Sequence, residues 1–151
     1  IKGTLVFKEI VVMDINANSS INVYSDKKDK ILNGQNTKNV MLRTSIDVDG
    51  AIVSTNDYLF EKTKFLNIDV QNFNVNVEKA DACYNIDIES KSFLNRFYAL
   101  CLNDSGVFSD NYFNMLPGEK RRIQFIPSEK FNGSTKFDPG LEFNSVLGLC
   151  S

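Results

Sequence analysis

Short runs of alternating apolar and polar residues are the main pattern along this chain. Phe73, Val75 and Val77 alternate with asparagines, and residues 84–88 repeat the pattern with other side chains. A period of two places alternate side chains on opposite faces of a strand, so each run predicts a strand with one apolar and one solvated face. No apolar stripe with helical spacing continues over three turns. The chain is therefore predicted to be all-β.

The clearest predicted turn is Asp49-Gly50, which lies between two apolar runs. Asp-Gly favours a β-hairpin because glycine accepts the positive φ that a two-residue turn requires. Asp47 and Asp49 also resemble the start of a calcium-binding loop. Such a loop needs a glutamate at its twelfth position, where this chain has Tyr58. A hairpin is therefore predicted here, without a metal.

Further strands are predicted wherever valine, isoleucine and phenylalanine concentrate. These segments are residues 4–15, 21–24, 97–102, 123–127 and 141–149. The continuous apolar run at 97–102 is typical of a central strand. Polarity and charge rise at residues 61–64, where we place the boundary between a domain of residues 1–62 and a domain of residues 63–151.

Composition excludes several kinds of chemistry. The chain has no histidine, so a Ser-His-Asp or Cys-His nucleophile cannot be built from it. A net charge of −2 gives no basic excess of the kind that nucleic-acid or anionic-membrane partners require. No apolar run approaches the ~18 residues of a membrane span. We therefore expect no nucleic acid, no membrane and no cofactor, and the first residues, Ile1-Lys2-Gly3, suggest a chain cut from a longer one.

Three cysteines, Cys83, Cys101 and Cys150, form no C-x-x-C unit and allow at most one disulfide. Cys83 and Cys101 stand beside apolar strand residues and are predicted to be buried thiols. The sequence leaves the disulfide state open.

Two pairs of acidic residues could be considered for acid/base catalysis: Glu78 with Asp81, and Asp87 with Glu89. A glycosidase pair must flank a sugar at a defined separation inside a pocket. These residues lie on predicted strand edges and loops, so catalysis is not expected from them.

The aromatic residues comprise 12 Phe and 5 Tyr, with no Trp. Most Phe fall on the apolar side of alternating segments and are predicted to pack in the core. Carbohydrate binding on an exposed tyrosine, Tyr98 or Tyr112, is the alternative.

One cluster of aromatic and polar residues is the candidate site: Phe108, Ser109, Asp110, Asn111, Tyr112 and Phe113. Asp110 or Asn111 can accept a hydrogen bond from the nearby backbone in an Asx-turn, while Phe108 and Phe113 anchor the two ends. The cluster holds neither a nucleophile nor a base. It is therefore predicted to be a structural corner.

The run FSDNYF at residues 108–113 resembles the F-S-D-N-x-F signature of the C-terminal immunoglobulin-like domain of β-mannosidases in glycoside hydrolase family 2. Three more segments resemble the same enzymes in the same order: residues 17–20, 54–60 and 143–147. Residues 54–60 are similar to the stretch that ends the preceding immunoglobulin-like domain. Exo-β-glucosaminidases and other members carry similar tails, so the sugar is not fixed by these motifs.

The resemblance implies two immunoglobulin-like β-sandwiches in tandem. Residues 1–62 would be the incomplete latter part of one, and residues 63–151 a complete last domain. An incomplete sandwich exposes a strand edge, so we expect it to pair with a second copy or to rest against a neighbouring domain.

The resemblance also implies a function for the parent enzyme. That enzyme would remove terminal, non-reducing β-D-mannose with retention of configuration, using two glutamates on a TIM barrel that this chain does not contain. This chain would be a non-catalytic accessory fragment that supports the barrel. Residues 108–113 would be a structural corner or would reach the pocket rim. The alternative is a stand-alone carbohydrate-binding or adhesion module. The compartment stays open: periplasmic, secreted or cytoplasmic in a bacterium, lysosomal in an animal.

Overall fold

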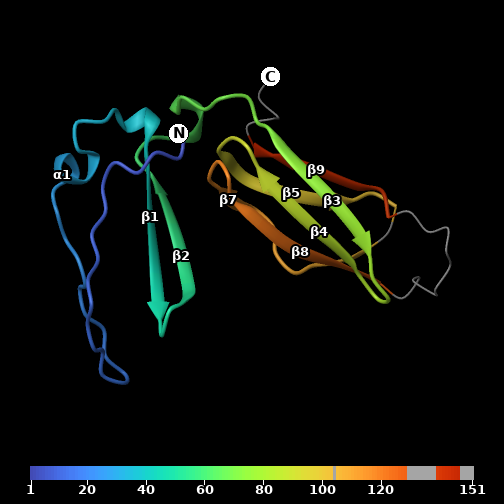
Figure 1. Ribbon diagram of the computed structural model, residues 1–151, viewed down its shortest axis with the longest axis horizontal. Coiled ribbons are helices and arrows are strands. Elements are labelled where there is room, and N and C mark those ends of the chain that lie inside the picture. The colour runs from blue at the N-terminus through green and yellow to red at the C-terminus, as the bar shows by residue number, and fades with distance from the viewer. Residues whose placement is uncertain (104, 129–138, 147–151) are drawn as a thin grey trace. The chain divides into compact units, whose positions relative to one another are not determined.

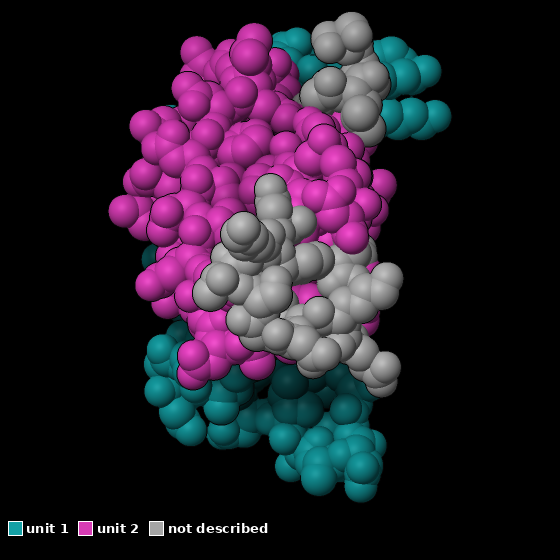
Figure 2. Space-filling model, turned by 90° about the vertical axis from the view of Figure 1, so that its right-hand side faces the viewer, with its two compact units in different colours: residues 1, 3–67 teal, residues 2, 68–151 magenta. Residues whose placement is uncertain are grey.

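The computed structural model describes residues 1–103, 105–128 and 139–146 (Figure 1). The chain separates into two compact units, which Figure 2 shows in different colours. Unit 1 comprises residues 1 and 3–67, and unit 2 comprises residues 2 and 68–151. Both units contain antiparallel strands, as the alternating pattern predicted.

Unit 1 contains one β-hairpin and three short helices. Its elements are α1 (Lys28–Leu32), η1 (Thr37–Asn39), β1 (Met41–Val48), β2 (Ala51–Leu59) and η2 (Thr63–Phe65). Asn33 ends α1 in the left-handed conformation, with a φ of 49°. Its side-chain amide donates a hydrogen bond of 3.0 Å to the carbonyl of Val6, which ties the N-terminal segment to the helix.

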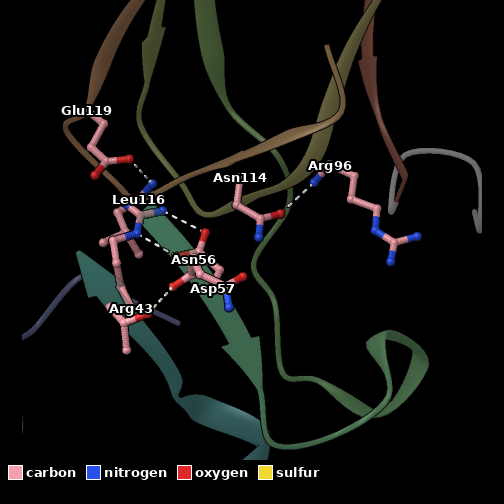
Figure 3. A network of polar contacts seen from close by, with 8 residues as sticks. Arg43, Asn56, Asp57, Arg96, Asn114, Leu116 and Glu119 are labelled. Atoms are coloured by element: carbon pink, nitrogen blue, oxygen red, sulfur yellow. Dashed lines mark hydrogen bonds and ion pairs between the residues drawn. The ribbon is translucent and has the colours of Figure 1, made fainter. Parts of the chain in front are cut away.

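The predicted Asp-Gly hairpin is confirmed. Asp49 and Gly50 have φ values of 53° and 82°, the two positive values that a type I′ turn needs. The Gly50 N–H donates to the Asp47 carboxylate at 2.8 Å, so that carboxylate serves the turn. Across the hairpin, Arg43 donates to Asp57, its partner in the strand register, at 2.7 and 2.9 Å (Figure 3).

The strands predicted at residues 4–15 and 21–24 are wrong. Neither segment is a strand, although both are rich in valine and isoleucine. A strand forms only where a neighbour exchanges backbone hydrogen bonds with it. In the described part of unit 1, β1 and β2 pair only with each other, so these segments find no ladder. Val12 is left 92% exposed as a result.

Unit 2 is an immunoglobulin-like β-sandwich, which confirms the predicted fold class. Its strands are β3 (Phe73–Lys79), β4 (Tyr84–Ser90), β5 (Leu94–Cys101), β6 (Gly106–Phe108), β7 (Phe113–Met115), β8 (Lys120–Pro127) and β9 (Leu141–Ser145). They form a four-stranded sheet in the order β3-β4-β8-β6 and a three-stranded sheet in the order β7-β5-β9. β5 is central in its sheet, as predicted. The remainder of the last predicted strand, after residue 146, lies outside the described residues.

The core of unit 2 lies between the two sheets. Its buried members are Tyr84, Ile86, Ile88, Leu94, Phe97, Ala99, Met115, Ile123 and Phe125. Along β4 every second residue is buried, which is the period-two pattern read from the sequence. Phe97 is fully buried, and its ring centroid lies 5.3 Å from that of Phe73 and 5.5 Å from that of Phe113. The prediction that phenylalanine forms the core is confirmed for these residues.

Cys83 and Cys101 are free thiols, as predicted, but they are half-buried rather than buried. Cys83 lies between β3 and β4, and Cys101 ends β5, so both stand where the chain leaves the core. The Cys101 thiol donates to the carbonyl of Pro139 at 3.1 Å. Cys150 lies outside the described residues.

Candidate functional site: the corner at residues 108–113

The candidate residues carry the chain from one sheet of the sandwich to the other. Phe108 ends β6 in the four-stranded sheet, and Phe113 begins β7 in the three-stranded sheet. The ring centroid of Phe108 lies 4.7 Å from that of Phe125, and the ring of Phe113 packs on Phe97. Each end of the corner is therefore fixed in the core, since aromatic pairs at these distances attract each other beyond their simple burial.

The side-chain amide of Asn111 acts as a substitute for a strand backbone. Its oxygen accepts from the Ala99 N–H at 2.8 Å, and its nitrogen donates to the Ala99 carbonyl at 3.0 Å. In the antiparallel ladder between β5 and β7, Phe97 pairs with Phe113. Two residues further along the same register, Ala99 would lie opposite residue 111. A carboxamide carries the same donor and acceptor as a peptide group. Asn111 thus extends the ladder of the short strand β7 by one position.

A second asparagine does the same at an irregular position of β5. The ladder shifts between Leu94 and Phe97, and Arg96 there has a φ of 50°. The Arg96 N–H donates to the side-chain oxygen of Asn114 at 2.9 Å, as Figure 3 shows. In the same view the Leu116 N–H donates to the Glu119 carboxylate at 2.7 Å. Side chains on and after β7 therefore satisfy backbone N–H groups that the irregular ladder leaves without a strand partner.

Asp110 holds the corner from two directions. One carboxylate oxygen accepts from the Asn111 N–H at 2.7 Å, and the other forms a close ion pair with Arg121 on β8. The guanidinium carbon of Arg121 also lies 4.1 Å from the ring centroid of Phe113. A cation over an aromatic face is attracted to it, so Arg121 links the turn to the first residue of β7.

Ser109 fastens the corner to the neighbouring strand. Its N–H donates to the Gln124 carbonyl at 2.8 Å, and its hydroxyl accepts from the Gln124 N–H at 2.9 Å. These two bonds continue the β6–β8 ladder past its last strand pair, Phe108 with Phe125. The six residues are thus joined to both sheets by backbone, amide and ionic contacts.

Tyr112 is the exposed member of the cluster. It is 60% exposed, has a φ of 61°, and donates its N–H to the Asn111 side-chain oxygen at 3.2 Å. Its ring stacks on Tyr98 with a centroid distance of 5.5 Å and an interplanar angle of 19°. The two tyrosines that the sequence offered as a platform are therefore in contact, with Tyr98 covered and Tyr112 open.

Three of the acidic residues considered for catalysis, Glu78, Asp87 and Glu89, lie on strands of the four-stranded sheet, and Asp81 lies between β3 and β4. Arg122 donates to both oxygens of Asp87, at 2.6 and 2.7 Å, and these hydrogen bonds lower the pKa of that carboxyl. Lys120 lowers the pKa of Glu89 in the same way, from 3.3 Å. A glycosidase general acid needs a raised pKa, so these anions cannot serve as one. Glu78 lies on β3 opposite Asn85.

Among the described residues, no group of three or more His, Cys, Asp or Glu side chains is placed to hold a metal ion. No helix in that part of the chain is long and apolar enough to cross a bilayer.

Several contacts of the corner were not visible in the sequence. Ala99, Arg121 and Gln124 hold residues 109–111 and come from strands that the sequence placed but did not order. Knowing that β8 pairs with β6 would have exposed the link between Ser109 and Gln124.

The corner and its supporting core fall within one matched family. Residues 69–146, more than half of the chain, match a family model for the Ig-fold domain of mannosidases. The chain belongs to this mannosidase Ig-fold family. Residues 1–64 match a second model, described as a mannosidase Ig/CBM-like domain. No curated protein matched the chain. The mannosidase Ig-fold assignment confirms the resemblance that the FSDNYF motif indicated.

Proposed function

We propose that this chain is a non-catalytic accessory part of a β-mannosidase-like glycoside hydrolase of family 2. The observation that carries the proposal is the order of two mannosidase-associated domains, over residues 1–64 and 69–146. Domains of this kind serve as accessories to a catalytic domain in mannosidase-like enzymes. The complete enzyme would remove terminal, non-reducing β-D-mannose from oligosaccharides with retention of configuration.

The catalytic partner in this proposal is a TIM barrel of the complete enzyme. Two glutamates on that barrel would act as acid/base and nucleophile, and the oligosaccharide would reach this chain only through the enzyme. Asp87 and Glu89 do not form a glycosidase acid/base pair, since Arg122 and Lys120 lower the pKa of both carboxyls and a general acid needs a raised one. We place the boundary between the domains after residue 62, close to the division between the compact units at 67 and 68.

Residues 108–113 would supply rigidity in this role. Their contacts to both sheets make the corner a fixed part of unit 2, which suits a domain that buttresses another. We therefore propose a structural role for Phe108, Ser109, Asp110, Asn111 and Phe113.

The proposal is tested with the complete enzyme and with this chain alone. Both are assayed on aryl β-D-mannoside, β-D-glucosaminide and β-D-galactoside. We expect the complete enzyme to hydrolyse the β-mannoside and this chain to hydrolyse none of the three. If the enzyme prefers another glycoside, the assignment of β-D-mannose as its substrate is wrong. If this chain alone hydrolyses a glycoside, the accessory role is wrong.

A second candidate function is carbohydrate binding by the chain itself. The match of residues 1–64 to an Ig/CBM-like domain favours it. Saturable glycan binding by unit 1, in the absence of any catalytic domain, would support this alternative.

Unit 1 also presents the hairpin of β1 and β2, whose outer edges have no ladder partner in the described residues. Pairing of that edge with a second copy would appear as a concentration-dependent dimer.

A further inference from the structure

Tyr112 has a solvent-exposed aromatic ring and an unusual backbone conformation. A bulky residue with positive φ is uncommon, and such residues concentrate at functional sites. Tyr112 combines a φ of 61° with an exposure of 60%. Folding alone would favour a small or polar residue at this position, because an asparagine or glycine adopts positive φ more readily.

The ring of Tyr112 is positioned from three sides. Its N–H is bound by Asn111, whose amide is fixed in turn by both backbone groups of Ala99. The next residue, Phe113, is packed in the core against Phe97. Tyr98 supports one face of the Tyr112 ring and is only 8% exposed. A ring held in this way loses little conformational entropy when a ligand binds to its open face.

The surroundings of the ring can form hydrogen bonds. Phe97 and Ala99 point into the core, so Tyr98 lies on the outer face of the three-stranded sheet. Asn144 pairs with Tyr98 in the strand register and is exposed, which places its amide on the same face. The nearby carboxylate of Asp110 is neutralised by Arg121. The surface therefore combines a flat apolar ring with amide and phenol groups.

We propose that the open face of Tyr112, supported by Tyr98, is a stacking platform for a neutral pyranose ring, with Asn144 as a hydrogen-bonding neighbour. A pyranose presents C–H groups on its face and hydroxyl groups at its rim, which matches an aromatic face bordered by polar groups. The inference rests on the proposed function, because the ligand is an oligosaccharide of the kind that the complete enzyme would hydrolyse.

The test is a titration of this chain, labelled with ¹³C in its tyrosine rings, with β-1,4-mannobiose followed by NMR. We expect the ring signals of Tyr112 and Tyr98 to shift and saturate in the millimolar range. Tyr112→Gly removes the ring and accepts positive φ, so the fold should survive. It should weaken binding at least about 10-fold, which corresponds to about 1.4 kcal/mol. Tyr112→Phe keeps the stacking face and should retain binding within about 3-fold.

Tyr58→Ala is the matched control, because Tyr58 is 59% exposed but lies on β2 in unit 1. Binding should be unchanged in this variant. Equal binding in Tyr112→Gly and the unmodified chain would overturn the platform. So would the absence of any shift at ~10 mM of mannobiose, cellobiose or chitobiose. Self-association that is lost in Tyr112→Gly, without glycan binding, would identify a protein-contact residue instead and also overturn it.

The outcomes separate the platform from the proposed function. Binding of cellobiose or chitobiose without mannobiose would keep the platform and contradict the β-mannoside assignment. Hydrolysis of β-mannoside by the complete enzyme, with no saccharide bound by this chain, would keep the function and overturn the platform.

Discussion

The two units differ in how their apolar residues are used. In unit 2, two sheets face each other and enclose a core in which Phe97, Phe125 and Ile86 are fully buried. In unit 1, one hairpin is the only strand pair among the described residues, and Ile46 and Ile52 on it remain exposed. A two-stranded hairpin is marginally stable without a third strand or a packed layer. The comparison shows that strand-forming composition becomes structure only where a neighbouring strand completes the ladder.

The two units should differ most in how much stability they lose when an apolar side chain is truncated to alanine. Phe97→Ala removes the ring that three other phenylalanines contact and should lower the free energy of unfolding by about 3–5 kcal/mol. Val12→Ala in unit 1 should change it by less than about 0.5 kcal/mol, since Val12 is 92% exposed. Urea unfolding followed by tyrosine fluorescence measures both. Similar effects of the two substitutions would contradict the difference in packing.

Each unit contains a glycine that the fold requires, and the physical reason differs between the two. A Cβ at Gly106 in unit 2 would lie 2.5 Å from the Ile126 carbonyl and the Phe125 ring, so Gly106→Ala should cost about 1–3 kcal/mol. A Cβ at Gly50 in unit 1 meets no atom within 4 Å, and only its φ of 82° opposes alanine. Gly50→Ala should therefore cost about 1 kcal/mol.

The asparagine that stands in for a strand provides the next test. Asn111→Asp removes the donor to the Ala99 carbonyl and places a carboxylate oxygen against it, which should cost about 2 kcal/mol. Asn22→Asp, at an exposed position of unit 1, should change stability by less than about 0.5 kcal/mol. Asn111→Ala also removes the oxygen that accepts from the Ala99 N–H, so hydrogen exchange of the Ala99 amide should accelerate in that variant. An Ala99 amide equally protected in Asn111→Ala and in the unmodified chain would show that Asn111 does not extend the ladder.

The smallest expected effect is the response of unit 2 to acid. The folded pKa of Asp87 is lowered by Arg122, so the pair stabilises the fold above the usual carboxyl pKa near pH 4. That contribution is lost as the pH falls through the lowered value. The difference in urea midpoint between the unmodified chain and Asp87→Asn should therefore shrink from pH 6 to pH 3. A difference in urea midpoint that grows toward low pH would show that ionised Asp87 does not stabilise the fold.

Sequence reasoning worked where the signal was local. Alternation predicted β3, β4 and β8, and Asp49-Gly50 predicted its turn, because side-chain period and positive φ are properties of neighbouring residues. The rings of Phe108 and Phe113 pack on Phe125 and Phe97, contacts that a corner anchored at both ends requires. The same composition failed at residues 4–15, since no local feature reports whether a ladder partner exists.

The rest of the site depends on the order of strands in the sheets. Asn111 and Ala99 are 12 residues apart, and Arg122 and Asp87 are 35 apart. Their contacts require knowing that β7 pairs with β5 and that β8 pairs with β4. Alternation is equally compatible with other strand orders, so these partners could not be assigned from it.

The structural role of the corner is tested most directly by Asp110→Ala, in this chain and in the complete enzyme. The substitution removes the bonds to Asn111 and Arg121, so unit 2 should lose about 1 kcal/mol or more and melt about 4–8 °C lower. The KM of the complete enzyme for an aryl β-D-mannoside should stay the same. An unchanged melting temperature together with a raised KM would contradict the structural role and place Asp110 at the rim of the substrate pocket.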